Sequence, residues 1–153
     1  MRENFESAAE SLKEFEGGFS NDADDPGGAT MFGIASASHP DIVFPITWEQ
    51  AKDIYLLEYW VRGGCDVLAY PLDVLHFDCC VNMGVGAAGR ILKLSQGYND
   101  VLKESVDYQH HRMDRYIEIV GEKPKMLKFL RGWMIRTLKL LDRTVLTIWT
   151  QGG

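Results

Sequence analysis

Hydrophobic residues recur with helical spacing at the start of the chain. Five apolar residues occupy positions i, i+3, i+4, i+7 and i+10 of one helix face: Phe5, Ala8, Ala9, Leu12 and Phe15. This stripe predicts an amphipathic helix over residues 4–16, and the glycine pair at 17–18 is typical of a helix end. Turn-forming residues then predict a loop over residues 21–28, and a short apolar segment at 30–35 predicts one strand of a small sheet.

The remainder of the chain is also dominated by helical patterns. Thr47-Trp48-Glu49-Gln50 has the sequence of a capping box, which predicts a second helix that runs to about residue 60. Later helices are expected at residues 71–83, 87–94 and 101–120, and from residue 127 onward. Gly84, Gly86 and Gly89 are expected to separate the first two of these. The predicted fold class is therefore all-α, with at most a minor β-hairpin.

Length and charge narrow the class of protein. A chain of 153 residues has the size of one domain, so we expect a single domain over residues 1–153. Residues 1–60 carry 12 acidic and 3 basic side chains, a net charge of −9, whereas residues 61–153 carry 10 and 13, a net charge of +3. The basic half indicates either a solvated helix face or a surface for an anionic partner. The total charge of −6 argues against a nucleic-acid-binding protein.

The N-terminus and the cysteines indicate where the protein is made. The first residues turn acidic and lack the apolar core of a secretory signal peptide, and no apolar run of about 18 residues predicts a transmembrane helix. The cysteines, Cys65, Cys79 and Cys80, are odd in number, which favours reduced thiols over a disulfide framework. We expect synthesis in the cytoplasm, without a signal peptide and without stable membrane insertion.

Glu16 is the residue that a purely structural role explains least well. It stands at the end of the first predicted helix, before a loop that contains Asp22, Asp24 and Asp25. The C-terminus of a helix carries a partial negative charge, so it disfavours an ionised glutamate. A carboxyl group that keeps its proton near neutral pH is what a general acid requires. A solvated glutamate at a helix end is the alternative.

The residues around Glu16 form a long and specific motif. Its two parts are Glu16-Gly-Gly-Phe-Ser-Asn-Asp and Asp25-Pro-Gly-Gly-Ala-Thr-Met-Phe-Gly-Ile. Three more segments follow in order: Tyr55-Leu-Leu-Glu-Tyr-Trp, Phe77-Asp-Cys-Cys-Val-Asn-Met-Gly and Gly132-Trp-Met-Ile-Arg. Together they resemble the motifs of glycoside hydrolase family 108, which comprises phage endolysins and bacterial secretion activator muramidases with a lysozyme-like helical fold. The resemblance spans residues 10–140.

The resemblance implies hydrolysis of the β-1,4 bond between N-acetylmuramic acid and N-acetylglucosamine in peptidoglycan, with Glu16 as the catalytic general acid. Glycoside hydrolysis also needs a group on the opposite face of the sugar, and Asp25 is the candidate. Glu16, Asp25 and Thr30 follow in the order Glu-x8-Asp-x4-Thr, which is one residue shorter than the Glu-x8-Asp-x5-Thr order of phage lysozymes. By analogy with those enzymes, Thr30 is expected to help hold a nucleophilic water. A carboxylate in a turn can instead be merely solvated or capping, and Asp22 and Asp24 are weaker candidates.

Four residues further along the chain are candidate substrate contacts. Asn82 stands on an otherwise apolar helix, where its amide either fixes a loop or binds the N-acetyl group of a sugar. Tyr55, Tyr59 and Trp60 can stack on sugar rings, but aromatic residues at helical spacing are also typical of a core. Both interpretations stay open for each of these residues.

No metal or cofactor is expected. His76 and His39 have no His or Cys partner at ligand spacing, and the adjacent His110 and His111 point to different sides of a helix. The acidic loop at residues 22–33 lacks two of the ligand positions that a calcium-binding EF-hand needs.

The sequence thus predicts a lysozyme-like domain whose partner is a peptidoglycan glycan strand. Residues 1–96 are expected to form the catalytic part, and residues 97–153 a helical part that is the candidate for further contact with peptidoglycan. The protein is expected to act on the cell wall or in the periplasm after release by a holin or an export route. Two other functions stay open: a non-hydrolytic or weakly active glycan-binding accessory protein for secretion, and a lytic transglycosylase. The oligomeric state is not predicted.

Overall fold

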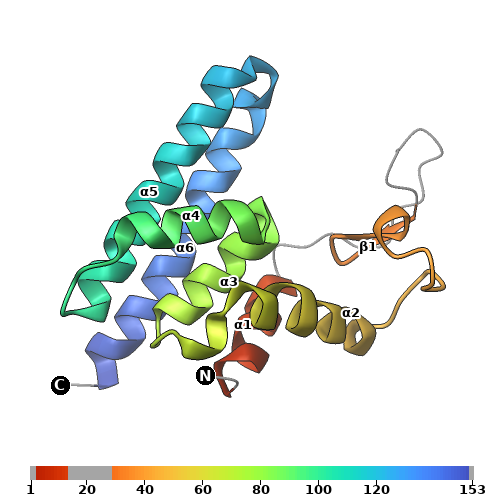
Figure 1. Cartoon of the computed structure of the whole chain (residues 1–153), viewed down its shortest axis with the longest axis horizontal. Helices are drawn as coiled ribbons and strands as arrows, with labels where there is room; N and C mark the ends of the chain where they lie inside the picture. Colours follow the sequence, from red (N-terminus) through yellow and green to blue (C-terminus); the bar gives the residue numbers. More distant parts are fainter. Residues whose placement is uncertain (1–2, 14–28, 152–153) are drawn as a thin grey trace.

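The computed structural model describes residues 3–13 and 29–151, which form six α-helices and one two-stranded antiparallel sheet (Figure 1). The α-helices are α1 Glu3–Lys13, α2 Trp48–Tyr55, α3 Leu72–Met83, α4 Val85–Ser95, α5 Val101–Glu122 and α6 Leu127–Gln151. The strands are β1 Thr30–Met31 and β2 Ile34–Ala35, and the short helical segments are η1 Ser36–Ser38, η2 Leu56–Val61, η3 Cys65–Val67 and η4 Pro124–Met126. The predicted all-α class with a minor hairpin is confirmed. No described helix has the length and apolar character that crossing a membrane requires.

Helix α3 forms the centre of the fold. Its residues 72–80 are buried one after another, so α3 is surrounded on all sides and not only along one face. Helices α1, α4 and α5 pack against it, together with η2 and η3. Figure 1 shows α3 in the middle of the molecule, between α1 and α4. A helix in this position is mostly apolar, and each polar side chain that it carries needs a partner.

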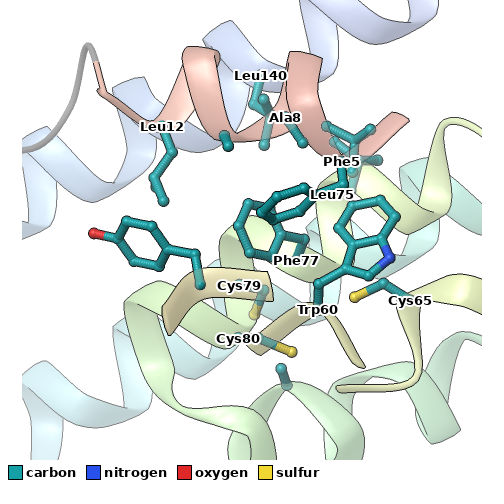
Figure 2. Close-up of a cluster of buried hydrophobic side chains, with 14 of the residues drawn as sticks. Phe5, Ala8, Leu12, Trp60, Cys65, Leu75, Phe77, Cys79, Cys80 and Leu140 are labelled. Atoms are coloured by element: carbon teal, nitrogen blue, oxygen red, sulfur yellow. The ribbon is translucent and has the colours of Figure 1, made fainter. Parts of the chain in front are cut away.

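Three aromatic rings fasten α1 and η2 to α3. Phe5 of α1, Trp60 of η2 and Phe77 of α3 meet edge to face, with centroid separations of 5.4, 5.6 and 5.7 Å (Figure 2). The indole Nε1 of Trp60 donates to Asp66 Oδ1 at 2.8 Å, so its one polar atom is satisfied inside the core. Burial of these large rings supplies much of the apolar stabilisation at this end of the molecule.

Local sequence signals predicted the start of α2 and the hairpin correctly. The Thr47 side chain accepts a hydrogen bond from the Gln50 backbone N at 3.2 Å, and Gln50 Oε1 accepts one from the Thr47 backbone N at 2.8 Å. This reciprocal pair is a capping box. The strand expected within residues 30–35 is a hairpin of two short strands. The end of the first predicted helix, residues 14–16, lies outside the described residues.

One glycine separates α3 from α4. The expectation that the helix resumes only at residue 87 is wrong, because Gly86 and Gly89 lie inside α4, which begins at Val85. Gly84 has a φ of 85°, which a residue with a side chain rarely adopts, so the chain turns at this one position.

Helices α5 and α6 lie side by side and are fixed to α3 through Asp78 (Figure 1). Arg112 Nη2 of α5 is 2.7 Å from Asp78 Oδ2, and Arg136 Nη2 of α6 is 2.8 Å from Asp78 Oδ1. Burial by itself would raise the pKa of Asp78, but the two guanidinium groups outweigh burial and hold this pKa below its usual value. The carboxylate therefore stays charged and joins three helices at one point.

Replacing Asp78 with Asn tests this junction. Arg112 is 0% exposed, so Asp78→Asn leaves a fully buried cation with a weakened partner. Removing one partner of a buried ion pair costs about 3–5 kcal/mol, and we expect the free energy of unfolding in urea to fall by about that amount. Asp114→Asn, which changes an exposed acid on α5, is the control and should alter stability by less than ~0.5 kcal/mol. Equal losses in the two variants would contradict this account.

Candidate functional site

The hairpin of β1 and β2 has a strained tip. Its register pairs Thr30 with Ala35 and Met31 with Ile34. The two turn residues, Phe32 and Gly33, have φ angles of 51° and 72°, as a type I′ turn requires. Glycine adopts this conformation readily, whereas a bulky residue such as Phe32 does not. The surrounding contacts must therefore hold Phe32 in place.

Side chains from α2 and η2 provide those contacts. The Tyr55 hydroxyl donates to the Phe32 carbonyl oxygen. The Trp48 ring packs edge to face on the Phe32 ring, with the centroids 5.3 Å apart. Just after the hairpin, His39 Nε2 lies 3.0 Å from Glu58 Oε1. The hairpin is thus attached to one continuous helical stretch both at its tip and where the chain leaves it.

Trp48 also contacts the end of α1. Its Nε1 donates to Glu10 Oε1 at 2.7 Å, and Lys13 Nζ lies 5.0 Å from the centroid of its ring, within the range of a cation–π interaction. Lys13 directly precedes segment 14–28, and Phe32 comes shortly after it. Trp48 therefore ties together the two described flanks of that segment. The sequence assigned Trp48 only a place in the capping box, because a contact between distant elements leaves no local pattern.

The predicted catalytic residues fall only partly within the described chain. Glu16 and Asp25 lie outside the described residues, as do the weaker candidates Asp22 and Asp24. Thr30 is half-buried and begins β1, so the hairpin register sets its backbone position. The same contacts that hold the tip of the hairpin therefore also hold Thr30.

The three aromatic candidates differ in accessibility. Trp60 is 0% exposed and Tyr55 is 1% exposed, so burial favours the core interpretation for both, because neither ring offers a face to a sugar. Tyr59 is half-buried, and its ring centroid lies 5.8 Å from that of Tyr55. Among these three residues, Tyr59 is the one whose surface a ligand can reach.

Asn82 lies in the wall of a hollow of about 360 Å³ that α3, α4, α5 and the first turns of α6 surround. The Tyr116 hydroxyl donates to Asn82 Oδ1 at 2.5 Å, and the Tyr116 ring stacks on Trp133 with a centroid separation of 4.9 Å. Arg90 and Arg115 also line the hollow. Asn82 thus fixes α5 against α3 and at the same time borders a concave surface, so both roles considered from the sequence fit its position.

Cys65, His76 and Cys80 form a buried cluster that was not predicted from the sequence. Their exposed fractions are 0%, 1% and 0%, and their donor atoms all lie within 4.8 Å of one another. The expectation that His76 lacks a Cys partner is wrong, because Cys80 follows four residues later on the same face of α3 and Cys65 approaches from η3. The i, i+4 spacing of His76 and Cys80 was the available signal.

The two thiols of this cluster are electrostatically unequal. The hydrogen bond from Cys65 and the adjacent His76 together outweigh burial and lower the pKa of Cys80 to about 6. The same contact between the sulfurs, together with burial, raises the pKa of Cys65. Of the two thiols, that of Cys80 is therefore the more acidic.

The overall fold is similar to that of a solved bacterial protein. The structure of Brucella abortus SagA aligns with a TM-score of 0.76 and 21% sequence identity, over 95% of this chain and 96% of the SagA chain. At this level of identity the likeness shows a shared fold. A comparison with curated proteins finds no match.

A family comparison covers the part of the chain that carries the hairpin. The model of the family described as Glycosyl hydrolase 108 matches residues 9–84. This range runs from the second half of α1 through the hairpin and α2 to the end of α3, and it includes Glu16, Asp25 and Thr30. The chain therefore contains a glycosyl hydrolase 108 domain.

Proposed function

We propose that this protein is an N-acetylmuramidase that hydrolyses the β-1,4 bond between N-acetylmuramic acid and N-acetylglucosamine in peptidoglycan. The family match over residues 9–84 carries this proposal, because membership implies a glycoside hydrolase and the matched range includes the Glu16 motif. The substrate and the bond follow from the resemblance of the motif to those of phage endolysins and secretion activator muramidases. The protein acts on the cell wall after release from the cytoplasm.

Glu16 serves as the general acid in this mechanism. Cleavage requires a protonated carboxyl group beside the leaving oxygen and a second polar group across the sugar ring, where positive charge develops in the transition state. Asp25 takes the second role, and Thr30 orients the water that attacks the sugar. The fixed hairpin supports this assignment, because it holds the backbone of Thr30 in one place relative to α2.

The substrate is a neutral or weakly acidic glycan, so aromatic and amide contacts are expected to dominate its binding. Tyr59 is the accessible aromatic candidate near the hairpin, and Asn82 is the amide candidate beside the hollow. Arg90 and Arg115 on the rim of that hollow suit the carboxyl groups of the peptide stems. No cofactor has a role in this reaction.

The first test is Glu16→Gln, which keeps the shape of the side chain and removes the proton donor. General acid catalysis contributes about 10²–10⁴-fold, so we expect reducing-end release from purified peptidoglycan to fall by at least about 100-fold. Glu14→Gln removes the same charge two residues earlier and is the matched control, which should keep near-normal activity. Circular dichroism and thermal unfolding establish that both variants are folded.

Each other outcome of this experiment identifies a different function. Equal cleavage by wild type and Glu16→Gln would make Glu16 structural. Glycan binding without cleavage by either protein would indicate an accessory protein for secretion. Products with anhydro-muramic ends, detected by mass spectrometry, would indicate a lytic transglycosylase.

Trp48→Ala tests whether the flanks of segment 14–28 position the chemistry. The substitution removes the ring that Phe32 and Lys13 both contact. A misplacement of about 1 Å can cost about 100-fold in rate, so we expect kcat to fall by about 10- to 100-fold in a protein that remains folded. Trp48→Phe retains an aromatic ring for both contacts and should recover most of the activity. Full activity in Trp48→Ala would show that these contacts do not matter to catalysis.

A further inference from the structure

The cluster of Cys65, His76 and Cys80 offers three metal-binding atoms that converge from two elements. Two thiol sulfurs and one imidazole nitrogen are the donor types that Zn²⁺ prefers in proteins. All three side chains are buried, and the donor atoms lie within 4.8 Å of one another. No proposed step of glycan cleavage uses these residues, so their arrangement calls for a separate explanation.

The distance between Cys80 and His76 fits tetrahedral coordination. Zn–S bonds of about 2.3 Å and Zn–N bonds of about 2.0–2.1 Å, meeting at a tetrahedral angle, separate sulfur and nitrogen by about 3.6 Å. Cys80 Sγ lies 3.6 Å from His76 Nε2. An oxygen ligand in the same geometry would lie about 3.4 Å from the nitrogen, and the Gly63 carbonyl oxygen is 3.1 Å from His76 Nε2. Small movements of these side chains would therefore complete a four-coordinate site.

Two glycines allow the chain to approach the sulfur atoms. A Cβ atom at Gly63 would lie 2.8 Å from Cys80 Sγ and 3.5 Å from Cys65 Sγ, so only glycine fits beside the pair. Gly64 has a φ of 73°, which turns the backbone and brings Cys65 back toward α3. The cluster is thus built by the backbone as well as by the three side chains.

Tyr108 orients the imidazole ring. Its hydroxyl oxygen lies 2.8 Å from His76 Nδ1, which directs the other ring nitrogen, Nε2, toward Cys80 and Gly63. A hydrogen bond to the second nitrogen is the usual support of a metal-binding histidine, because it fixes both the orientation and the tautomer. Tyr108 is fully buried on α5, so the support is rigid.

We propose that Cys65, His76 and Cys80 bind one structural Zn²⁺ ion, with the Gly63 carbonyl oxygen as the fourth ligand. Two thiolates neutralise the charge of the ion, which makes the complex tolerable in a buried site. All the side chains that bind it are buried, so no position faces a substrate and the ion has no part in catalysis. The ion would link the turn between η2 and η3 to α3, next to the aromatic core. This role does not depend on whether the protein cleaves glycan.

The test uses the full-length protein, treated with a chelator and kept reduced with a phosphine. Titration with Co²⁺ should produce sulfur-to-metal charge-transfer absorption and the intense visible bands of tetrahedral coordination, reaching saturation at one ion per chain. Added Zn²⁺ should abolish this spectrum and raise the midpoint of urea unfolding as its concentration increases. A folded, reduced wild type that shows neither change would overturn the proposal.

The chain provides a matched control for the cysteine variants. Cys79 is a buried thiol beside Cys80, but it lies outside the cluster. Cys79→Ala should keep the Co²⁺ spectrum, whereas Cys80→Ser and His76→Asn should lose it. Tyr108→Phe keeps the ring and removes the hydroxyl, and should weaken Zn²⁺ binding by about 10- to 100-fold. Loss of binding in Cys79→Ala, or undiminished binding in Cys80→Ser, would contradict the assignment.

Wild-type protein alone keeps the proposal testable if the cluster variants do not fold. X-ray absorption at the zinc edge should show two sulfur and two lighter ligands. A first shell without sulfur would overturn the proposal. A second outcome would also overturn the proposal: the reduced protein binds no zinc, and air oxidation forms a Cys65–Cys80 disulfide. That disulfide would lower the mass of the protein by about two units.

Discussion

The burial of α3 on all sides over residues 72–80 is the constraint on which the rest of this structure depends. A helix with solvent on one side can leave its polar groups to water, but α3 cannot. Asp73 accepts a hydrogen bond from Asn4 of α1, and His76 is hydrogen-bonded to Tyr108 of α5. Asp78 forms ion pairs with arginines of α5 and α6. Each buried polar residue therefore fixes a neighbouring helix at a defined point. Burying an ion pair adds little net stability, but it penalises any arrangement in which a partner is missing.

This constraint brings segments that are far apart in the chain into contact. Asp78 belongs to the Phe77 segment and Arg136 to the Gly132 segment, and the two residues form one ion pair. Asn82, from the same segment as Asp78, accepts from Tyr116, whose ring stacks on Trp133. Packing around α3 therefore brings these segments together. The residues proposed for catalysis lie instead in the N-terminal half, within the range that the family model matches.

Local signals in the sequence predicted most of the elements, but they did not predict the contacts between them. The capping box at Thr47 and the apolar stripe of α1 act within a few residues, so their outcome is visible in the sequence. The burial of Trp60 and the double contact of Trp48 depend on how distant elements pack. The cluster of Cys65, His76 and Cys80 needs both a local i, i+4 pair and a third residue brought in by a turn. Glu16 and Asp25 were identified by a specific motif, and their roles remain predictions.

The contacts of Trp48 have a consequence for how this fold can diversify. Because one ring contacts both Lys13 and Phe32, a single side chain links the end of α1 to the tip of the hairpin. The Trp48 ring can keep this link in a chain with more or fewer residues between Lys13 and Phe32. Proteins with this scaffold can thus differ in that length while the packing of α1, the hairpin and α2 stays the same.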